Sequence, residues 1–210
     1  MLSTSLKKTL LILYLTIPLF IFATHISYSQ NDWKLKKQKN GIKVYTKSHA
    51  SENLKYYKLT TTFRADFSKV VQLNLDFDNY ETWVKDCAES KIIDKMDENT
   101  IIYYSRIDTP WPVNDRDFLS EVNITLGQNQ ILIHTKPASI DYPESKGAVR
   151  MIEYEDHWRI KNLDSGMVKL ELEGFYNPGG SIPSWIVNMF IVDAPYESVL
   201  KLKELTGTEY

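Results

Sequence analysis

The chemically reactive side chains of this 210-residue sequence are few, and their spacing does not predict a catalytic site. His49, His134 and His157 lack the mutual spacing that is typical of metal ligands. The sequence has no Cys-x-x-Cys pair, no glycine-rich phosphate loop and no Gly-x-Ser-x-Gly nucleophile turn. We therefore expect no catalytic residue, no metal ion and no cofactor.

An acidic run near the end of a predicted strand is the densest group of titratable side chains. It contains Glu153, Glu155, Asp156 and His157. Such a run is typical of a solvated strand edge or turn, and we interpret it that way. The single cysteine, Cys87, excludes an internal disulfide, and we expect it to be an unreactive core residue.

The N-terminal segment has the composition of a signal peptide. Two lysines precede an uncharged apolar run over residues 9–23, which is shorter than the ~20 residues that a membrane-spanning helix needs. We predict that residues 1–29 are a signal peptide cleaved before Gln30. Residues 30–210 would then form one exported domain, periplasmic or secreted, with a retained N-terminal anchor as the alternative.

The predicted mature chain is mildly acidic, which excludes some partners. Without two leader lysines, 23 of the 25 basic residues remain against 27 acidic ones, a net charge of about −4. Nucleic acid requires a concentrated basic face, so we expect no nucleic-acid partner, and we expect a monomer. Lys34, Lys36, Lys37 and Lys39 are interpreted as a solvated helix face, with transient contact to an anionic membrane surface as the alternative.

Period-two segments predict a largely antiparallel, curved sheet. The first strands cover residues 42–46 and 57–63. Three hairpins follow, with turns at residues 97–99, 127–129 and 164–166. The strands of the third hairpin are expected around residues 149–160 and 167–176. Hairpins in succession favour antiparallel pairing and strong twist.

Helical periodicity appears in two other parts of the chain. Ser68 is a candidate N-cap for a helix that follows it, and a short helical segment is expected near residues 80–84. Near the C-terminus, the residues at helical spacing are Ile182, Trp185, Ile186, Met189 and Phe190. Pro195 then predicts a kink or break before the apolar pattern resumes.

Two motifs carry a resemblance to a known family. Residues 110–118 include Pro110, Trp111, Pro112, Arg116 and Asp117. Residues 178–188 include Gly179, Gly180 and Pro183. These motifs, in this order, resemble those of the StAR-related lipid-transfer (START) domain, here as an exported, bacterial-type, single-domain member. The resemblance extends from Trp33 to Leu205.

The resemblance implies an α+β helix-grip fold, in which a curved antiparallel sheet wraps around a long C-terminal helix and encloses a hydrophobic cavity. It implies binding of one lipid or similar apolar molecule without chemical conversion, with transfer as a further step and the helix as gate. The first motif is expected to be mainly structural: Trp111 packs, the prolines rigidify the loop, and Asp115 or Asp117 holds Arg116. Gly179 and Gly180 are expected to form a tight turn.

The resemblance also implies a set of ligand contacts. On the strands these are Tyr57, Leu59, Phe63, Tyr103, Ser105, Val122 and Ile124, and on the lid helix Trp185, Met189 and Phe190. Sterol-binding relatives often pair an acid with an arginine in the cavity, where this chain has Tyr103 and Val122. A sterol ligand is therefore not implied, and the hydroxyls of Tyr103 and Ser105 are candidate anchors for a polar head.

Two other functions remain open from the sequence. A helix-grip enzyme, such as a cyclase or hydrolase acting on an aromatic or polyketide-like substrate, would need a cavity-facing acid, base or nucleophile. Glu121, His134 and His157 are the candidates for that role. An interaction protein whose cavity is filled by side chains would instead show only ordinary packing voids.

Overall fold

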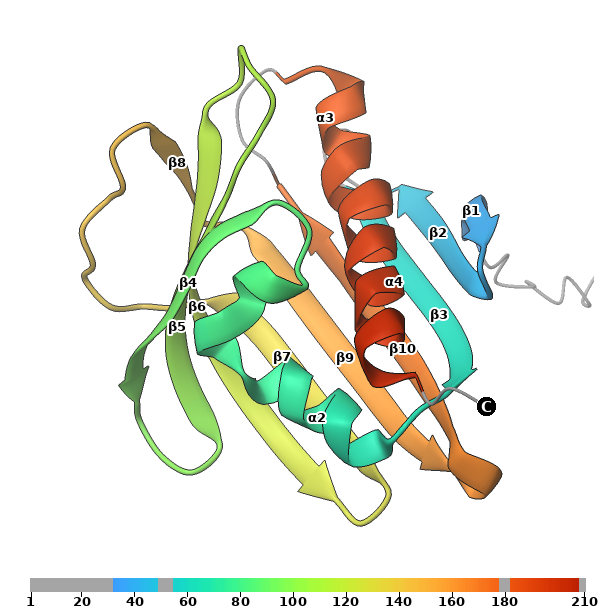
Figure 1. Cartoon of the computed structure of the whole chain (residues 1–210). Helices are drawn as coiled ribbons and strands as arrows, with labels where there is room; N and C mark the ends of the chain where they lie inside the picture. Colours follow the sequence, from blue (N-terminus) through green and yellow to red (C-terminus); the bar gives the residue numbers. More distant parts are fainter. Residues whose placement is uncertain (1–31, 49–54, 178–181, 208–210) are drawn as a thin grey trace, which may run out of the picture. The chain divides into compact units, whose positions relative to one another are not determined.

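A ten-stranded sheet forms the body of the protein, as seen in the computed structural model, which describes residues 32–48, 55–177 and 182–207 (Figure 1). The strands are β1 (Lys34–Lys39), β2 (Ile42–Ser48), β3 (Lys55–Arg64), β4 (Cys87–Lys95), β5 (Thr100–Ile107), β6 (Asp115–Gly127), β7 (Gln130–Pro137), β8 (Ala148–Met151), β9 (Tyr154–Leu163) and β10 (Met167–Tyr176). Their spatial order is β1-β2-β3-β10-β9-β7-β6-β5-β4, and all neighbours along this path are antiparallel.

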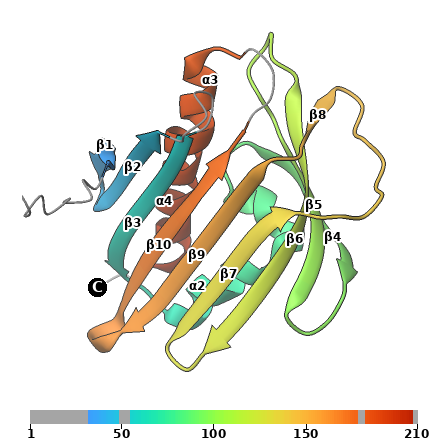
Figure 2. The ribbon, with the colours of Figure 1, turned by 180° about the vertical axis from the view of Figure 1, so that it is seen from behind.

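The helices cover one face of this sheet. They are α2 (Phe67–Leu75), the 3₁₀ segment η2 (Phe77–Thr82), and a C-terminal run of α3 (Ser184–Asn188), the π-helical η4 (Met189–Asp193) and α4 (Ala194–Thr206). A further 3₁₀ segment, η3 (Asp164–Gly166), forms the turn between β9 and β10. Seen from the other side, the strands lie in front of α2, α3 and α4 (Figure 2). The arrangement is the predicted helix-grip fold, which is confirmed.

Strand alternation explains which face is buried. Along β3 the buried residues alternate with more exposed ones from Tyr57 to Phe63, and the buried residues of β10 include Val168, Leu170 and Leu172. These side chains pack against the C-terminal helical run, which contributes Ile191 and Val199 to the same core. Burial of apolar side chains at every second position is what a sheet with one covered face requires.

The third predicted hairpin is only partly right. The segment predicted to run as one strand from residue 149 to residue 160 is divided in two. The first piece, β8, pairs in parallel with β6, and β9 begins only at Tyr154. The division lets β9 lie between β7 and β10, where the hairpin with β10 is as expected.

The helix boundaries also differ from those expected. Asp66, not Ser68, caps α2, because its Oδ1 accepts a hydrogen bond of 2.9 Å from the Ser68 backbone N–H. Pro195 does not break the C-terminal run, which continues through α4. The turn before it is the π-helical η4, where the helix accommodates a proline that lacks an N–H and crowds the carbonyl oxygen four residues earlier.

The basic patch lies on a strand, so the predicted helix face is wrong. Its lysines belong to β1, an edge strand of the sheet. Lys37 is tied to the C-terminal run: its Nζ lies 2.8 Å from Asp193 Oδ1 and 4.1 Å from the centre of the Tyr196 ring. In the described part of the chain, no helix is long and apolar enough to cross a membrane.

The first motif forms a loop whose two aspartates are held by arginines of neighbouring strands. Asp115 pairs with Arg106 on β5, and Asp117 is bound by Arg150 on β8 at 2.9 and 3.0 Å. Arg116 is buried and donates a hydrogen bond to the Asn114 carbonyl oxygen. Trp111 does not pack; it is 91% exposed. The loop owes its fixed position to ion pairs across three strands.

The second motif is only partly described. Pro183 precedes α3 as its N-terminal flanking residue. The predicted tight turn at Gly179 and Gly180 lies outside the described residues, as does the predicted signal peptide.

Candidate functional site

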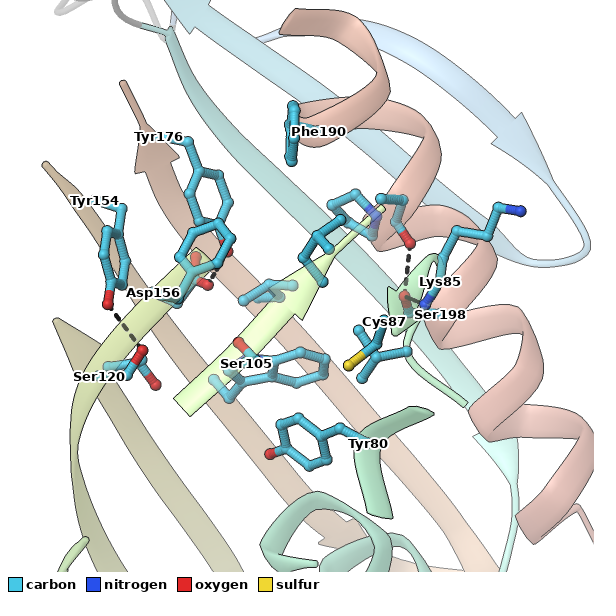
Figure 3. Close-up of a pocket in the computed structure, with 18 of the residues that line it drawn as sticks. Tyr80, Lys85, Cys87, Ser105, Ser120, Tyr154, Asp156, Tyr176, Phe190 and Ser198 are labelled. Carbon is cyan, nitrogen blue, oxygen red and sulfur yellow. Dashed lines mark hydrogen bonds between the residues drawn. The ribbon is translucent and has the colours of Figure 1, made fainter. Parts of the chain in front are cut away.

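A cavity of about 140 Å³ lies under the C-terminal helical run (Figure 3). Its apolar wall includes Ile107, Phe118, Ile133, Trp158 and Leu172. The volume exceeds an ordinary packing void, since interiors hold few voids larger than a water molecule. The described structure therefore does not have the fully filled centre that the interaction-protein alternative would need.

The C-terminal run supplies one wall of the cavity. Phe190 comes from the π-helical η4, and Ala194, Pro195 and Ser198 come from α4. Ser198 also holds this wall in place, because its Oγ accepts a 2.9 Å hydrogen bond from the Lys85 backbone N–H. The same hydroxyl donates to the Ala194 carbonyl oxygen at 2.7 Å. The wall is thus fastened to the loop before β4.

A carboxylate lies at the polar end of the cavity. Asp156 on β9 accepts one hydrogen bond from the Tyr57 hydroxyl at Oδ1 and another from the Tyr176 hydroxyl at Oδ2. The strand register explains the first contact, since Gly174 on β10 lies opposite both Tyr57 and Asp156. A methyl group at Gly174 would overlap the Asp156 carboxylate and the Glu155 carbonyl oxygen. Glycine at this position therefore makes room for the tyrosine to reach the acid.

Burial dominates the electrostatics of this group. Burial raises the pKa of Asp156 to about 6, although the hydrogen bonds from Tyr176 and Tyr57 favour its charged form. The pKa values of Tyr57 and Tyr176 are raised well above their usual range by burial and by the neighbouring carboxylate. Both tyrosines therefore remain protonated donors at neutral pH, and Asp156 is mostly ionised.

A second polar pair lies nearby on the sheet. The Tyr154 hydroxyl donates to the Leu119 carbonyl oxygen at 3.0 Å, which leaves the Ser120 hydroxyl to donate to Tyr154 over 2.8 Å. Tyr154 and Ser120 both line the cavity, together with the predicted anchors Tyr103 and Ser105. The polar end is therefore rich in hydroxyl groups and contains one carboxylate.

The predicted ligand contacts fall into three groups. Those that line the cavity are Tyr57, Tyr103, Ser105 and Phe190. Those buried in the core away from the cavity wall are Leu59, Phe63, Val122 and Ile124. Trp185 is 49% exposed, and Met189 is half-buried against the core. Contact of any of these residues with a ligand stays a prediction.

Sequence reasoning missed Asp156 and its partner Tyr176. The acidic run was interpreted as a solvated edge, yet Asp156 is buried, whereas Glu153 and His157 are exposed and Glu155 is partly exposed. Two signals were present in the sequence. Asp156 has the same parity as Tyr154 and Trp158, and Gly174 interrupts an otherwise apolar strand face, which marks a close approach.

The three residues that would have favoured an enzyme do not line the cavity. Glu121 forms an ion pair with Lys136 at 3.0 Å. His134 and His157 occupy opposite positions on β7 and β9, with rings stacked at 4.3 Å, and both contact Glu155. Among the described residues, this is the group that could approach a metal ion, with ligand atoms within 4.8 Å. Strand register brings together histidines whose sequence spacing suggested no relation.

Cys87 lines the cavity but is not a reactive nucleophile. Burial, with a contribution from the charge of Glu81, raises the pKa of its thiol to about 12. The thiolate is the reactive form, and it is scarce at neutral pH. The expectation of an unreactive core cysteine agrees with this environment.

Comparison with known proteins gives a consistent result. The family model described as START domain matches residues 21–194. An uncharacterized protein of Pseudomonas aeruginosa, PA1579, is 34% identical over 173 residues, covering 82% of this chain and 85% of that protein. The phosphatidylcholine transfer protein of Rattus norvegicus is 23% identical, covering 75% of each chain. The crystal structure of a STAR-related lipid transfer protein from Xanthomonas axonopodis superposes with a TM-score of 0.73 at 26% identity, over 83% of this chain and 98% of that one.

Proposed function

Because the chain belongs to the START-domain family, we propose that its cavity binds one lipid or similarly apolar molecule, under the control of the C-terminal helical run, and releases it unchanged. Lipid binding or transfer in general is what the family and its lipid-transfer relatives support. The cavity under α4, lined by aliphatic and aromatic side chains, is the observation that carries the proposal for this chain. Burying ~300 Å² of ligand surface at ~25 cal/mol/Å² would contribute about 7 kcal/mol before entropy costs.

The size of the cavity supports a gated mechanism. At about 140 Å³ it is smaller than the ~300–1,000 Å³ of typical small-molecule sites, so a lipid can enter only if a wall moves. The C-terminal run is the wall we assign to that motion, because its π-helical turn lies directly against the cavity. The polar contacts that would break on opening include Lys37 with Asp193, and Lys85 with Ser198 and Glu197.

An enzyme of the helix-grip superfamily is the second candidate. One observation favours it: Asp156 is an acid inside the cavity with a raised pKa, as general acids often have. Against this, both oxygens of Asp156 already accept tyrosine hydrogen bonds, an arrangement that holds the group in place. We therefore assign Asp156 a binding role, and a bound molecule should be recovered with unchanged mass.

A cavity-filling variant tests the proposal. Ala194→Phe places a ring in the cavity from α4, so transfer of a dye-labelled lipid between donor and acceptor vesicles should fall at least about tenfold, a loss of about 1.4 kcal/mol or more. Leu205→Phe, on the exposed side of the same helix, is the matched control and should transfer like the wild type. Circular dichroism checks the folding of both variants. Equal transfer by Ala194→Phe and the wild type would remove this cavity as the binding site.

We also propose that the domain is exported. A signal peptide over residues 1–29 would deliver a monomeric domain to the periplasm or exterior, where the donor of the lipid would be an envelope membrane. The lysines of β1 are then candidates for transient contact with an anionic membrane surface.

A further inference from the structure

We propose that the polar end of the cavity selects a lipid whose head is an uncharged hydrogen-bond donor, such as an alcohol, and rejects a head that carries a negative charge. The inference rests on the proposed function, since it concerns the ligand of the same cavity. The residues that carry it are Asp156, Tyr57 and Tyr176.

The hydrogen bonds at Asp156 leave only acceptor positions open to a ligand. Each carboxylate oxygen accepts one tyrosine hydroxyl, although a carboxylate has about four acceptor positions. The hydroxyl hydrogens of Tyr57 and Tyr176 are already donated to Asp156, so the oxygens of these tyrosines can only accept a further hydrogen bond. A ligand group bound here must therefore donate, which an alcohol does and an ionised carboxylate or phosphate diester cannot.

Charge excludes the same ligands more strongly. Among the described residues that line the cavity, Asp156 is the only acid and Lys85 the only base. Lys85 lies beside α4, well apart from Asp156 (Figure 3), and its ammonium pairs with Asp86 at 2.9 Å and Glu197 at 3.5 Å. An anionic head next to Asp156 would thus be buried against a like charge with no cation to offset it, which is costly in a poorly solvated site.

A quaternary ammonium head beside Asp156 is also a poor match. The rings of Tyr57 and Tyr176 stack at 5.7 Å and 13°, and those of Tyr154 and Tyr176 at 6.0 Å and 19°. Stacked rings present their faces to one another, whereas an aromatic cage for an ammonium needs faces that converge on the cation.

A second polar group in the wall suits a neutral head. Trp83 lines the same cavity and is 4% exposed, and no described residue accepts a hydrogen bond from its Nε1–H. A buried donor without a partner is costly, and a hydroxyl or ester oxygen of a ligand would satisfy it. A neutral lipid head can therefore supply both the donor that Asp156 lacks and the acceptor that Trp83 lacks.

The test compares two ligands of the same chain length whose heads differ in charge and in the ability to donate a hydrogen bond. Displacement of the neutral dye N-phenyl-1-naphthylamine by dodecanol and by dodecanoate is measured at about pH 8, where both Asp156 and dodecanoate are ionised. For the wild type we expect dodecanol to bind at least about tenfold more tightly than dodecanoate. Asp156→Asn keeps the side-chain shape but removes the charge, so it should reduce this preference to less than about threefold.

Two further variants make the outcome decisive. Glu171→Gln removes a charge from β10 outside the cavity, where Glu171 pairs with Lys169, and should keep the full preference. Tyr176→Phe frees one acceptor position on Asp156, so its preference for dodecanol over dodecanoate should be at least as large as that of the wild type. A reduced preference in this variant would count against the proposal even if Asp156→Asn does not fold.

The failures can be told apart. Equal binding of dodecanol and dodecanoate by the wild type would overturn the head selection and leave lipid binding standing, and so would a preference that persists in Asp156→Asn. If neither the dye nor either ligand binds, the proposed function itself fails.

Discussion

Asp156 is a buried acid whose hydrogen bonds do not fully compensate its burial. Asp66, by contrast, is an exposed acid whose Oδ1 accepts a hydrogen bond from the Ser68 backbone N–H at the start of α2. One aspartate thus lies under the C-terminal helical run and the other at the surface. The raised pKa of Asp156 makes the stability of the domain depend on pH.

The sign of that dependence follows from the shift. An unfolded aspartate titrates near pH ~3.9, whereas Asp156 in the folded state titrates at about 6, so the folded state holds the extra proton between these values. The contribution of Asp156 to stability is therefore full below about pH 4, falls as the pH rises through 6, and amounts to about 3 kcal/mol at most.

Asp156→Asn should gain stability relative to the wild type by up to that amount between about pH 4.5 and pH 7.5, measured by urea unfolding. Glu171→Gln should show no such gain, and a pH-independent difference between wild type and Asp156→Asn would contradict the burial of a titrating acid.

The C-terminal run is the element on which the proposed gating depends. Its π-helical turn places Phe190 on the cavity, and its polar contacts to other elements include Lys37 with Asp193, Lys85 with Ser198 and Glu197, and Asn40 with Tyr196 and Lys203. Sequence periodicity and Pro195 predicted this helix and an irregularity before the apolar pattern resumes, and the π-helical turn lies directly before the turn that contains Pro195. The cross-element bonds could not be predicted, since they depend on where the loop before β4 meets the helix.

A pair of hydroxyl variants tests the fastening of this helix. Ser198 and Thr206 both donate to the carbonyl oxygen four residues earlier, at 2.7 Å in each case, but only Ser198 also accepts from the Lys85 N–H. Ser198→Ala removes a hydrogen bond of about 1 kcal/mol from the closed state, so release of a labelled lipid to excess vesicles should accelerate about fivefold in stopped-flow measurements. Thr206→Val should release lipid at the wild-type rate. Identical rates for both variants would show that the Lys85–Ser198 bond does not hold the gate.

At the scale of the whole molecule, the fold could be predicted from the sequence and the cavity wall could not. The alternating strands, the hairpin turns and the two motifs were sufficient to predict a helix-grip domain. The alternation of residues along a strand predicts which side chains point inward. It does not predict that Leu59 and Val122 pack in the core while Tyr103 and Ser105 line the cavity, because the helices that cover the sheet determine this difference. The Asp156 cluster depends on the register of three strands, and no local pattern contains that register.

Whether this cavity holds a lipid is measured by native mass spectrometry of the protein expressed from residue 1. We expect a monomer that begins at Gln30, if the proposed signal peptide is cleaved, and that carries a non-covalent adduct of lipid mass, which organic extraction recovers unchanged. Ala194→Phe should lack the adduct, and Leu205→Phe should keep it. A folded wild-type protein with no adduct, no extractable lipid and no uptake of added lipid would contradict the account.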